Sequence, residues 1–139
     1  MTFAEELPDQ CPPQEAVDQK LERVCRFLTF EQSDPKNFYS HSKLGKPSGK
    51  ASECHARSLS LFKEDAVPNF VAAKRMAFFR KCKIAILTIP CGVGLSVVGK
   101  TGHIDLWPFQ GSDVSACSTE VLETPDEIQK NISGGPRHV

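Results

Sequence analysis

The sequence predicts a single α+β domain with a largely antiparallel sheet and two or three helices. Its length of 139 residues is typical of one domain with a packed core. Three strand-length segments separated by turn residues lie between residues 82 and 109, which predicts a β-meander. Apolar residues at helical spacing follow Pro13 and Pro68, and proline is favoured in the first turn of a helix.

The N-terminal part is expected to begin with a flexible segment over residues 1–12. Pro12 and Pro13 can open a helix, and Val17, Leu21 and Val24 would form its apolar face. Residues 25–30 are typical of a strand, or of the last turn of that helix followed by a strand. The domain itself is expected to span residues 13–111.

Residues 31–54 are predicted to form a long loop, which is unusual in a compact domain and indicates a functional role. Its segment 45–50, Gly-Lys-Pro-Ser-Gly-Lys, offers backbone amides and lysines that could hold a phosphate. An ordinary mobile loop is the alternative interpretation. Residues 55–62 then alternate in polarity as a strand does, with His55, Arg57 and Leu59 on one face.

The second half of the chain is predicted to contain a helix and the meander. The helix should begin at about Pro68 and end at about Arg80. The strands of the meander are expected at 82–89, 93–98 and 103–107, with a hairpin turn at 99–102. Residues 112–139 are expected to form a polar, acidic tail in which Pro125 opens a short helix.

Residues 94–101 match the P-loop pattern G-x-x-x-x-G-K-[ST]. A P-loop joins a strand to a helix, whereas residues 103–107 alternate like a strand and end at Pro108. We therefore interpret the match as a coincidence, and a P-loop nucleotide hydrolase is the least favoured function.

Six cysteines are spread along the chain without a C-x-x-C pair. The first six residues are acidic and lack the basic and apolar regions of a signal peptide. We therefore expect a cytoplasmic protein with reduced thiols. Potential zinc ligands are scattered instead of paired at short spacing, so neither a metal site nor a cofactor is predicted.

Charge is segregated along the chain although the net charge is zero. Residues 36–111 contain twelve basic and four acidic residues, a net charge of +8, and the two flanking segments are acidic. A basic region of this kind can bind an anionic partner such as a nucleic acid, a nucleotide or an acidic protein. Solvated faces that neutralise each other are the alternative. The candidate binding residues are Lys46, Ser48, Lys50, His55, Arg57, Lys74, Arg75, Lys81, Lys83 and His103.

Two of these candidates are histidines with a possible common site. If the strands at 55–62 and 103–107 lie side by side, His55, Arg57, His103 and Asp105 would converge on a polar patch with acid–base capacity. Whether the strands are neighbours does not follow from the sequence.

Two resemblances can be stated. The motifs Phe38–His41, the G-x-P-[ST] loop at 45–48, Leu59–Phe62 and Gly102–Ile104 resemble those of small uncharacterised bacterial proteins, which implies no activity. The order Arg26, then Ser58-Leu59-Ser60, then Glu120 or Glu123 is similar to that of ADP-ribosyltransferases, which implies NAD as substrate.

The function predicted from the sequence is that of a small cytosolic binding or accessory module. It would contact an anionic partner through its basic central region and would not involve a membrane, because no apolar run is long enough to span one. An ADP-ribosyltransferase-like enzyme that uses NAD is the alternative, so catalysis is left open.

Overall fold

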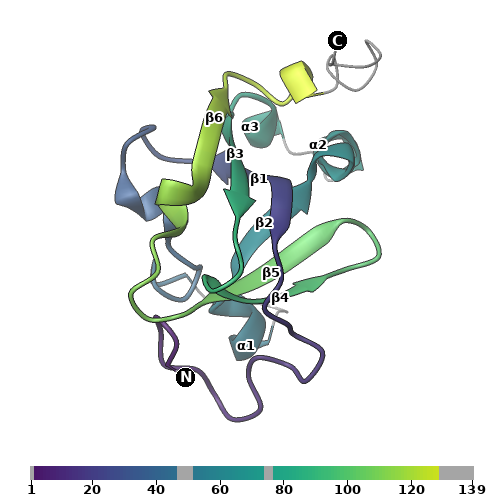
Figure 1. The fold of residues 1–139 in the computed structure, drawn as a ribbon. Helices are drawn as coiled ribbons and strands as arrows, with labels where there is room; N and C mark the ends of the chain where they lie inside the picture. Colours follow the sequence, from purple (N-terminus) through teal and green to yellow (C-terminus); the bar gives the residue numbers. More distant parts are fainter. Residues whose placement is uncertain (1, 47–51, 74–76, 129–139) are drawn as a thin grey trace.

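The computed structural model describes residues 2–46, 52–73 and 77–128, and it confirms a single α+β domain with one antiparallel sheet. The order of the six strands across the sheet is β4-β5-β2-β1-β3-β6 (Figure 1). Their bounds are β1 Leu21–Leu28, β2 Leu59–Lys63, β3 Lys83–Ile89, β4 Gly94–Val98, β5 His103–Pro108 and β6 Ser118–Leu122. The short helices are α1 Glu53–Ala56, α2 Val67–Ala73 and α3 Ala77–Arg80, with 3₁₀ turns η1 Pro35–Phe38, η2 Glu64–Ala66 and η3 Val114–Cys117.

Each face of the sheet buries its own hydrophobic cluster. Val24, Leu61 and Leu87 belong to one cluster, together with Val114 of the η3 turn, and Phe38 of the η1 turn packs against it. The other cluster includes residues of β1, β2 and β3 together with side chains of α2 and α3: Cys25, Phe27, Phe62, Ile84, Ile86, Val71 and Phe79. Strands β1 and β3 therefore carry apolar residues at consecutive positions, as strands covered on both faces do.

The sheet is strongly curled. Strands β3 and β4 are four places apart, which in a flat sheet would separate them by about 19 Å. Residues 90–93 alone connect them, and such a connection reaches about 18 Å when fully extended. Curling brings the end of β3 close to the start of β4, and Figure 1 shows β4 and β5 crossing the direction of β3 steeply.

The predicted β-meander over 82–109 is wrong, although its three strands exist. Strands β4 and β5 form the expected hairpin, with Val98 opposite Ile104, but β3 pairs with β1 and β6 instead of β4. Both edges of the apolar strand β3 are thus occupied by partners from distant parts of the sequence. The hairpin turn at 99–102 confirms that the P-loop match is not a strand–helix junction: the Gly99 amide donates to the His103 carbonyl at 2.8 Å.

Two other local predictions are also wrong. Residues 13–20 are not helical, because Val17 exchanges backbone hydrogen bonds with Ser96 as an isolated β-bridge and β1 begins at Leu21. The strand predicted to begin at His55 begins instead at Leu59, since Ser52 caps the short helix α1 with its side chain. Within the predicted helix at 68–80 the structure has α2 and α3, and residues 74–76 lie outside the described residues.

The ends of the domain also differ from the predicted bounds of residues 13 and 111. Residues 118–122, placed by the sequence in a polar tail, form β6 and pair with β3 at the edge of the sheet. Thr119 and Glu120 are exposed, whereas Val121 packs against one hydrophobic cluster and Leu122 belongs to the other, so the end of this edge strand contributes to both faces of the sheet. Near the N-terminus, Phe3 forms a β-bridge with Phe109. A helical segment begins at 126–128, within the predicted C-terminal helix, whose remainder lies outside the described residues.

One pair of cysteines is oxidised, contrary to the prediction that all six are thiols. Cys11 and Cys54 form a disulfide with a Cα–Cα distance of 5.6 Å, whereas Cys25, Cys82, Cys91 and Cys117 are free. The two partners are 43 residues apart in the sequence, so no local spacing motif could reveal them.

The disulfide predicts a specific alkylation pattern. When the protein is denatured without reduction, the four free cysteines should be alkylated and peptide mapping should recover Cys11 linked to Cys54. Reduction before alkylation should label all six. Six labelled cysteines in the unreduced sample of freshly purified protein would contradict the disulfide.

Two glycines provide a matched test of the β4–β5 hairpin. Gly102 and Gly111 have similar positive φ angles of 90° and 87°. A Cβ at Gly102 would lie 2.6 Å from the Ala66 Cβ, but one at Gly111 would meet no atom within 4 Å. Because the conformational cost is shared, Gly102→Ala should lower the free energy of unfolding by about 1–3 kcal/mol more than Gly111→Ala. Urea denaturation measures this difference. Equal losses of the free energy of unfolding in the two variants would show that Gly102 does not pack against Ala66.

Candidate functional site

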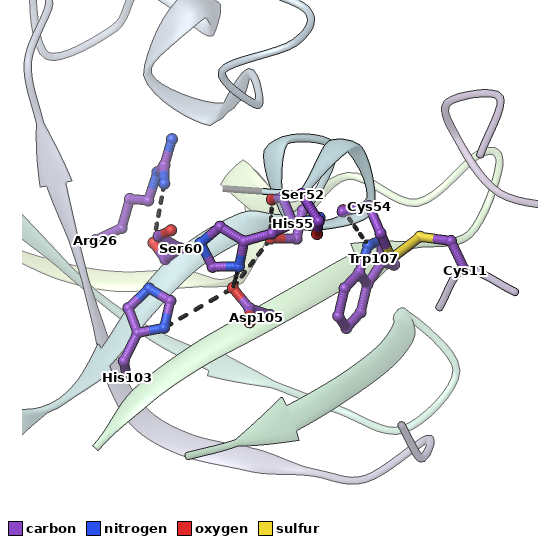
Figure 2. A network of polar contacts seen from close by, with 10 residues as sticks. Cys11, Arg26, Ser52, Cys54, His55, Ser60, His103, Asp105 and Trp107 are labelled. Atoms are coloured by element: carbon purple, nitrogen blue, oxygen red, sulfur yellow. Dashed lines mark hydrogen bonds and ion pairs between the residues drawn. A yellow bond between two sulfur atoms is a disulfide. The ribbon is translucent and has the colours of Figure 1, made fainter. Parts of the chain in front are cut away.

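The candidate site is built where β2 pairs with β5. Ser60 lies opposite Asp105 and Phe62 lies opposite His103 in the antiparallel register. Asp105 and His103 are two residues apart on β5, so both side chains point to the same face of the sheet. The short helix α1 immediately precedes β2 and adds His55 to this face (Figure 2).

Helix α1 is held in place by several contacts near His55. The Ser52 hydroxyl accepts a hydrogen bond from the His55 amide at 3.1 Å. The indole nitrogen of the buried Trp107 donates to the Cys54 carbonyl at 3.0 Å, which ties α1 to β5. The disulfide from Cys54 to Cys11 adds the N-terminal segment to this support. The backbone that carries His55 is therefore fixed from three directions.

Asp105 lies between the two histidines (Figure 2). Its Oδ1 is 3.0 Å from the Nδ1 of His55 and 3.8 Å from the Nδ1 of His103. The Ser58 hydroxyl lies 3.1 Å from the same oxygen and 2.8 Å from the His55 carbonyl. Burial, opposed by Asp105 and assisted by the charge of His55, lowers the pKa of His103. We call His55, His103 and Asp105 the His–Asp cluster.

Arg26 fills the space where β1 and β2 diverge. The two strands pair through Val24–Lys63 and Cys25–Phe62. Beyond these pairs, the Arg26 guanidinium donates to the carbonyls of Ser60 at 2.9 Å, Asn37 at 2.9 Å and Tyr39 at 3.2 Å. The side chain thus connects β2 with η1 and Tyr39, and its bond to Ser60 replaces a hydrogen bond that the two strands would otherwise make.

Arg26 also lines a cavity of about 50 Å³ that lies between α1, the start of β2 and the loop after η1. Its other lining residues are mostly hydroxyl-bearing or histidine: Tyr39, Ser40, His41, His55, Ala56, Ser58 and Ser60. None of the described residues that line it is an aspartate or a glutamate. We call this space the Arg26 cavity.

The charged groups at the Arg26 cavity are positive. Burial lowers the pKa of Arg26 to about 10, which leaves the guanidinium charged at neutral pH. Arg26 makes no ion pair with a carboxylate in the described part of the chain. The pKa of His41 is lowered, first by burial and then by the charges of Lys46, Arg26 and His55.

The structure brings together two of the ten candidates named from the sequence, because His55 and His103 belong to the His–Asp cluster. A third candidate, Lys46, is exposed and does not line the Arg26 cavity, but its charge lowers the pKa of His41. The candidates Ser48, Lys50, Lys74 and Arg75 lie outside the described residues.

The remaining three candidates lie elsewhere. Arg57 does not join the convergence expected from the sequence, because it pairs with Glu53 at 2.9 Å and donates to the Glu6 carbonyl. It lies at the end of α1 instead of on a strand, and it does not belong to the His–Asp cluster. Lys81 lies just after α3 and is exposed. The Lys83 ammonium donates a hydrogen bond to Gln32 at 3.0 Å and forms an ion pair with Glu123 at 3.8 Å.

His41 and Ser58 belong to the site but were not singled out as binding residues from the sequence. His41 lies next to Tyr39 and Ser40 in the predicted long loop, and this cluster of polar side chains was the available signal. Arg26 was named from the sequence only as the first residue in the order that resembles ADP-ribosyltransferases. Its place among the apolar residues at positions 24–28 of β1 is a stronger signal, because a charge at a largely covered position requires a role.

A second, larger cavity of about 230 Å³ adjoins the Arg26 cavity, because Tyr39 lines both. Its walls include aromatic side chains, two cations and two acidic residues: Phe3, Phe38, Tyr39, Trp107, Lys43, Arg57, Glu5 and Asp113. The Lys43 ammonium lies 4.1 Å from the centre of the Tyr39 ring, a cation–π contact. The two cavities together offer an aromatic surface beside a positively charged one.

Comparisons with protein-family models, with curated proteins and with solved structures found no match. In the part of the chain that the structure describes, none of the helices has the length and apolar character needed to cross a membrane.

The electrostatic coupling at the Arg26 cavity predicts the titration of His41. Its pKa, measured from the imidazole NMR signals, should lie below the usual value of about 6.5 and should rise in Lys46→Ala. Since an unfolded histidine binds its proton more tightly, His41 should lower the stability of the fold as the pH falls below about 6.5. Lys100→Ala, in the β4–β5 turn, is the control and should leave the titration unchanged. An unchanged pKa of His41 in Lys46→Ala would show that the charge of Lys46 does not act on the cavity.

Proposed function

We propose that the protein binds a phosphate-bearing ligand, with its phosphate in the Arg26 cavity. The proposal narrows the anionic partner expected from the sequence to one chemical group. Its central observation is a partly buried, charged arginine that has no carboxylate partner in the described part of the chain and that lies in a cavity lined by hydroxyl and imidazole groups.

The chemistry of Arg26 supports an anionic ligand. A buried charge is costly unless an opposite charge or several hydrogen bonds compensate it. Three backbone carbonyls accept from the guanidinium, which has five N–H donors. A phosphate could accept from the remaining donors and would supply the missing negative charge.

The surroundings of Arg26 add further donors. Lys46 contributes a second positive charge close to His41. The Ser40 oxygen accepts a hydrogen bond from the Lys43 amide at 3.0 Å, so its hydroxyl proton can be donated to a ligand. These groups match the acceptor oxygens of a phosphate.

The adjoining aromatic cavity supports a nucleotide as the source of that phosphate. Aromatic side chains such as Phe38 and Tyr39 can stack against a nucleobase. Tyr39 lies between the two cavities, so a ligand with a phosphate and an aromatic group could occupy both. A free mononucleotide and a single-stranded nucleic acid share this chemistry, and a titration can distinguish them.

The ADP-ribosyltransferase alternative has less support. Arg26, Ser58 and Ser60 do line one cavity, as that resemblance implies. However, Glu120 pairs with Arg23 at 3.1 Å and Glu123 lies 3.8 Å from Lys83, and neither carboxylate lines the cavity. We therefore favour binding of the phosphate group over transfer chemistry on NAD.

The cellular location forms part of the proposal. The sequence alone favours the cytoplasm, but disulfides persist mainly in oxidising compartments. The Cys11–Cys54 bond therefore supports an oxidising environment for the folded protein.

A calorimetric titration tests the proposal. The protein should bind adenosine monophosphate more tightly than inorganic phosphate, since the aromatic cavity contributes only to the former. Lys46→Ala should weaken both affinities about two- to five-fold, as expected for the loss of an exposed charge contact. Arg26→Lys should weaken them by ten-fold or more, because an ammonium cannot reproduce the planar set of donors.

Controls distinguish binding from general charge effects. Lys100→Ala removes an exposed positive charge from the β4–β5 turn and should leave the affinities unchanged. A short single-stranded RNA that binds much more tightly than the mononucleotide would identify a nucleic acid as the ligand. Absence of binding by all three ligands at low salt, or equal losses in Lys46→Ala and Lys100→Ala, would contradict the proposal.

A further inference from the structure

The His–Asp cluster has a feature that the phosphate site does not explain. A single carboxylate oxygen of Asp105 faces the Nδ1 atoms of two imidazoles and the Ser58 hydroxyl. Two histidines and one carboxylate that converge in this way form a common set of ligands for divalent transition metals.

We propose that His55, His103 and Asp105 bind a divalent transition-metal ion such as Zn²⁺. The sequence analysis predicted no metal site because the potential ligands are scattered along the chain. The pairing of β2 with β5 removes this objection, because it places residues 55, 103 and 105 beside one another.

The distances fit such an ion. One potential ligand atom from each of the three side chains can be chosen so that all lie within 4.8 Å of one another. Zinc–nitrogen and zinc–oxygen bonds are about 2.0–2.2 Å long, which places tetrahedral ligands about 3.4 Å apart. The cluster therefore needs small side-chain adjustments, and the backbone can stay in place.

The chemistry of the ligands selects the type of metal. Imidazole nitrogens favour Zn²⁺ and other late transition metals, whereas Mg²⁺ and Ca²⁺ prefer oxygen ligands throughout. Three protein ligands leave a fourth position of a tetrahedral ion open. The side chains of His55, His103 and Asp105 are 41, 31 and 19 % exposed, so water or a ligand can reach that position.

Residues around the cluster are suited to orient its ligands. The Ser58 hydroxyl contacts the ligating oxygen of Asp105, an outer contact of the kind that orients metal-bound carboxylates. The Trp107–Cys54 hydrogen bond fixes α1, which carries His55, and strand β5 carries the other two ligands two positions apart. Such support favours a preformed site over one assembled by the ion.

Metal titration of the full chain tests this site independently of the phosphate proposal. The background variant Cys91→Ser removes the exposed thiol, which could bind Zn²⁺ by itself. Calorimetry should show one Zn²⁺ bound per chain in the absence of any phosphate, with release of protons. Co²⁺ should give visible ligand-field bands typical of mixed nitrogen and oxygen ligation.

Substitutions of the cluster residues test whether Zn²⁺ binds at the His–Asp cluster. His103→Gln and Asp105→Asn should each weaken Zn²⁺ binding by ten-fold or more. His41→Gln is the matched control, because it removes a histidine from the Arg26 cavity and leaves the cluster intact. Asp105→Asn is nearly isosteric, so it keeps the test decisive if His103→Gln does not fold, as judged by circular dichroism.

The outcomes separate the two proposals. Loss of Zn²⁺ binding in the cluster variants, with retention in His41→Gln and Lys46→Ala, would support the metal site whatever the phosphate titrations show. No stoichiometric binding of Zn²⁺ or Co²⁺, or binding that the cluster variants leave unchanged, would overturn it.

Discussion

The pairing of β2 with β5 is the interaction on which the candidate sites depend. It aligns Ser60 with Asp105 and Phe62 with His103, and thereby sets the residues of β5 beside the segment that leads into β2. A shift of one residue in this register would turn Asp105 and His103 to the opposite face, where the first hydrophobic cluster lies. The apolar Leu59 and Leu61, which alternate with the polar positions, hold the register because both are buried in that cluster.

The second constraint is the divergence of β1 from β2. Backbone groups at a divergence of two strands lose their ladder hydrogen bonds and must find other partners. Arg26 provides such a partner for the Ser60 carbonyl of β2, and it also donates to the carbonyls of Asn37 and Tyr39, which explains how its charge is accommodated among apolar neighbours in β1. The same position leaves its charge next to His41 and Ser40. A structural role and a binding role for Arg26 are thus compatible, since the first uses some of its donors and the second uses the rest.

Local patterns predicted the strands at 83–89, 94–98 and 103–108 well, because their apolar periodicity and turn residues are properties of short segments. The helix expected over 13–24 was wrong because Val17, Leu21 and Val24 happen to follow a helical period while β1 is buried on both faces. The neighbours of β3, the Cys11–Cys54 bond and the convergence of His55 with His103 depend on contacts between distant segments. A sequence can name such residues but cannot show that they meet.

The central claim is that the basic residues around Arg26 form one anion site. The most direct measurement follows the imidazole NMR signals of the full chain during titration with adenosine monophosphate at constant pH and salt. His41 and His55 line the Arg26 cavity, so their signals should shift together and saturate at one ligand per chain. His103, which is not among the lining residues, should shift less. Unchanged signals of His41 and His55 at saturating ligand would contradict the account.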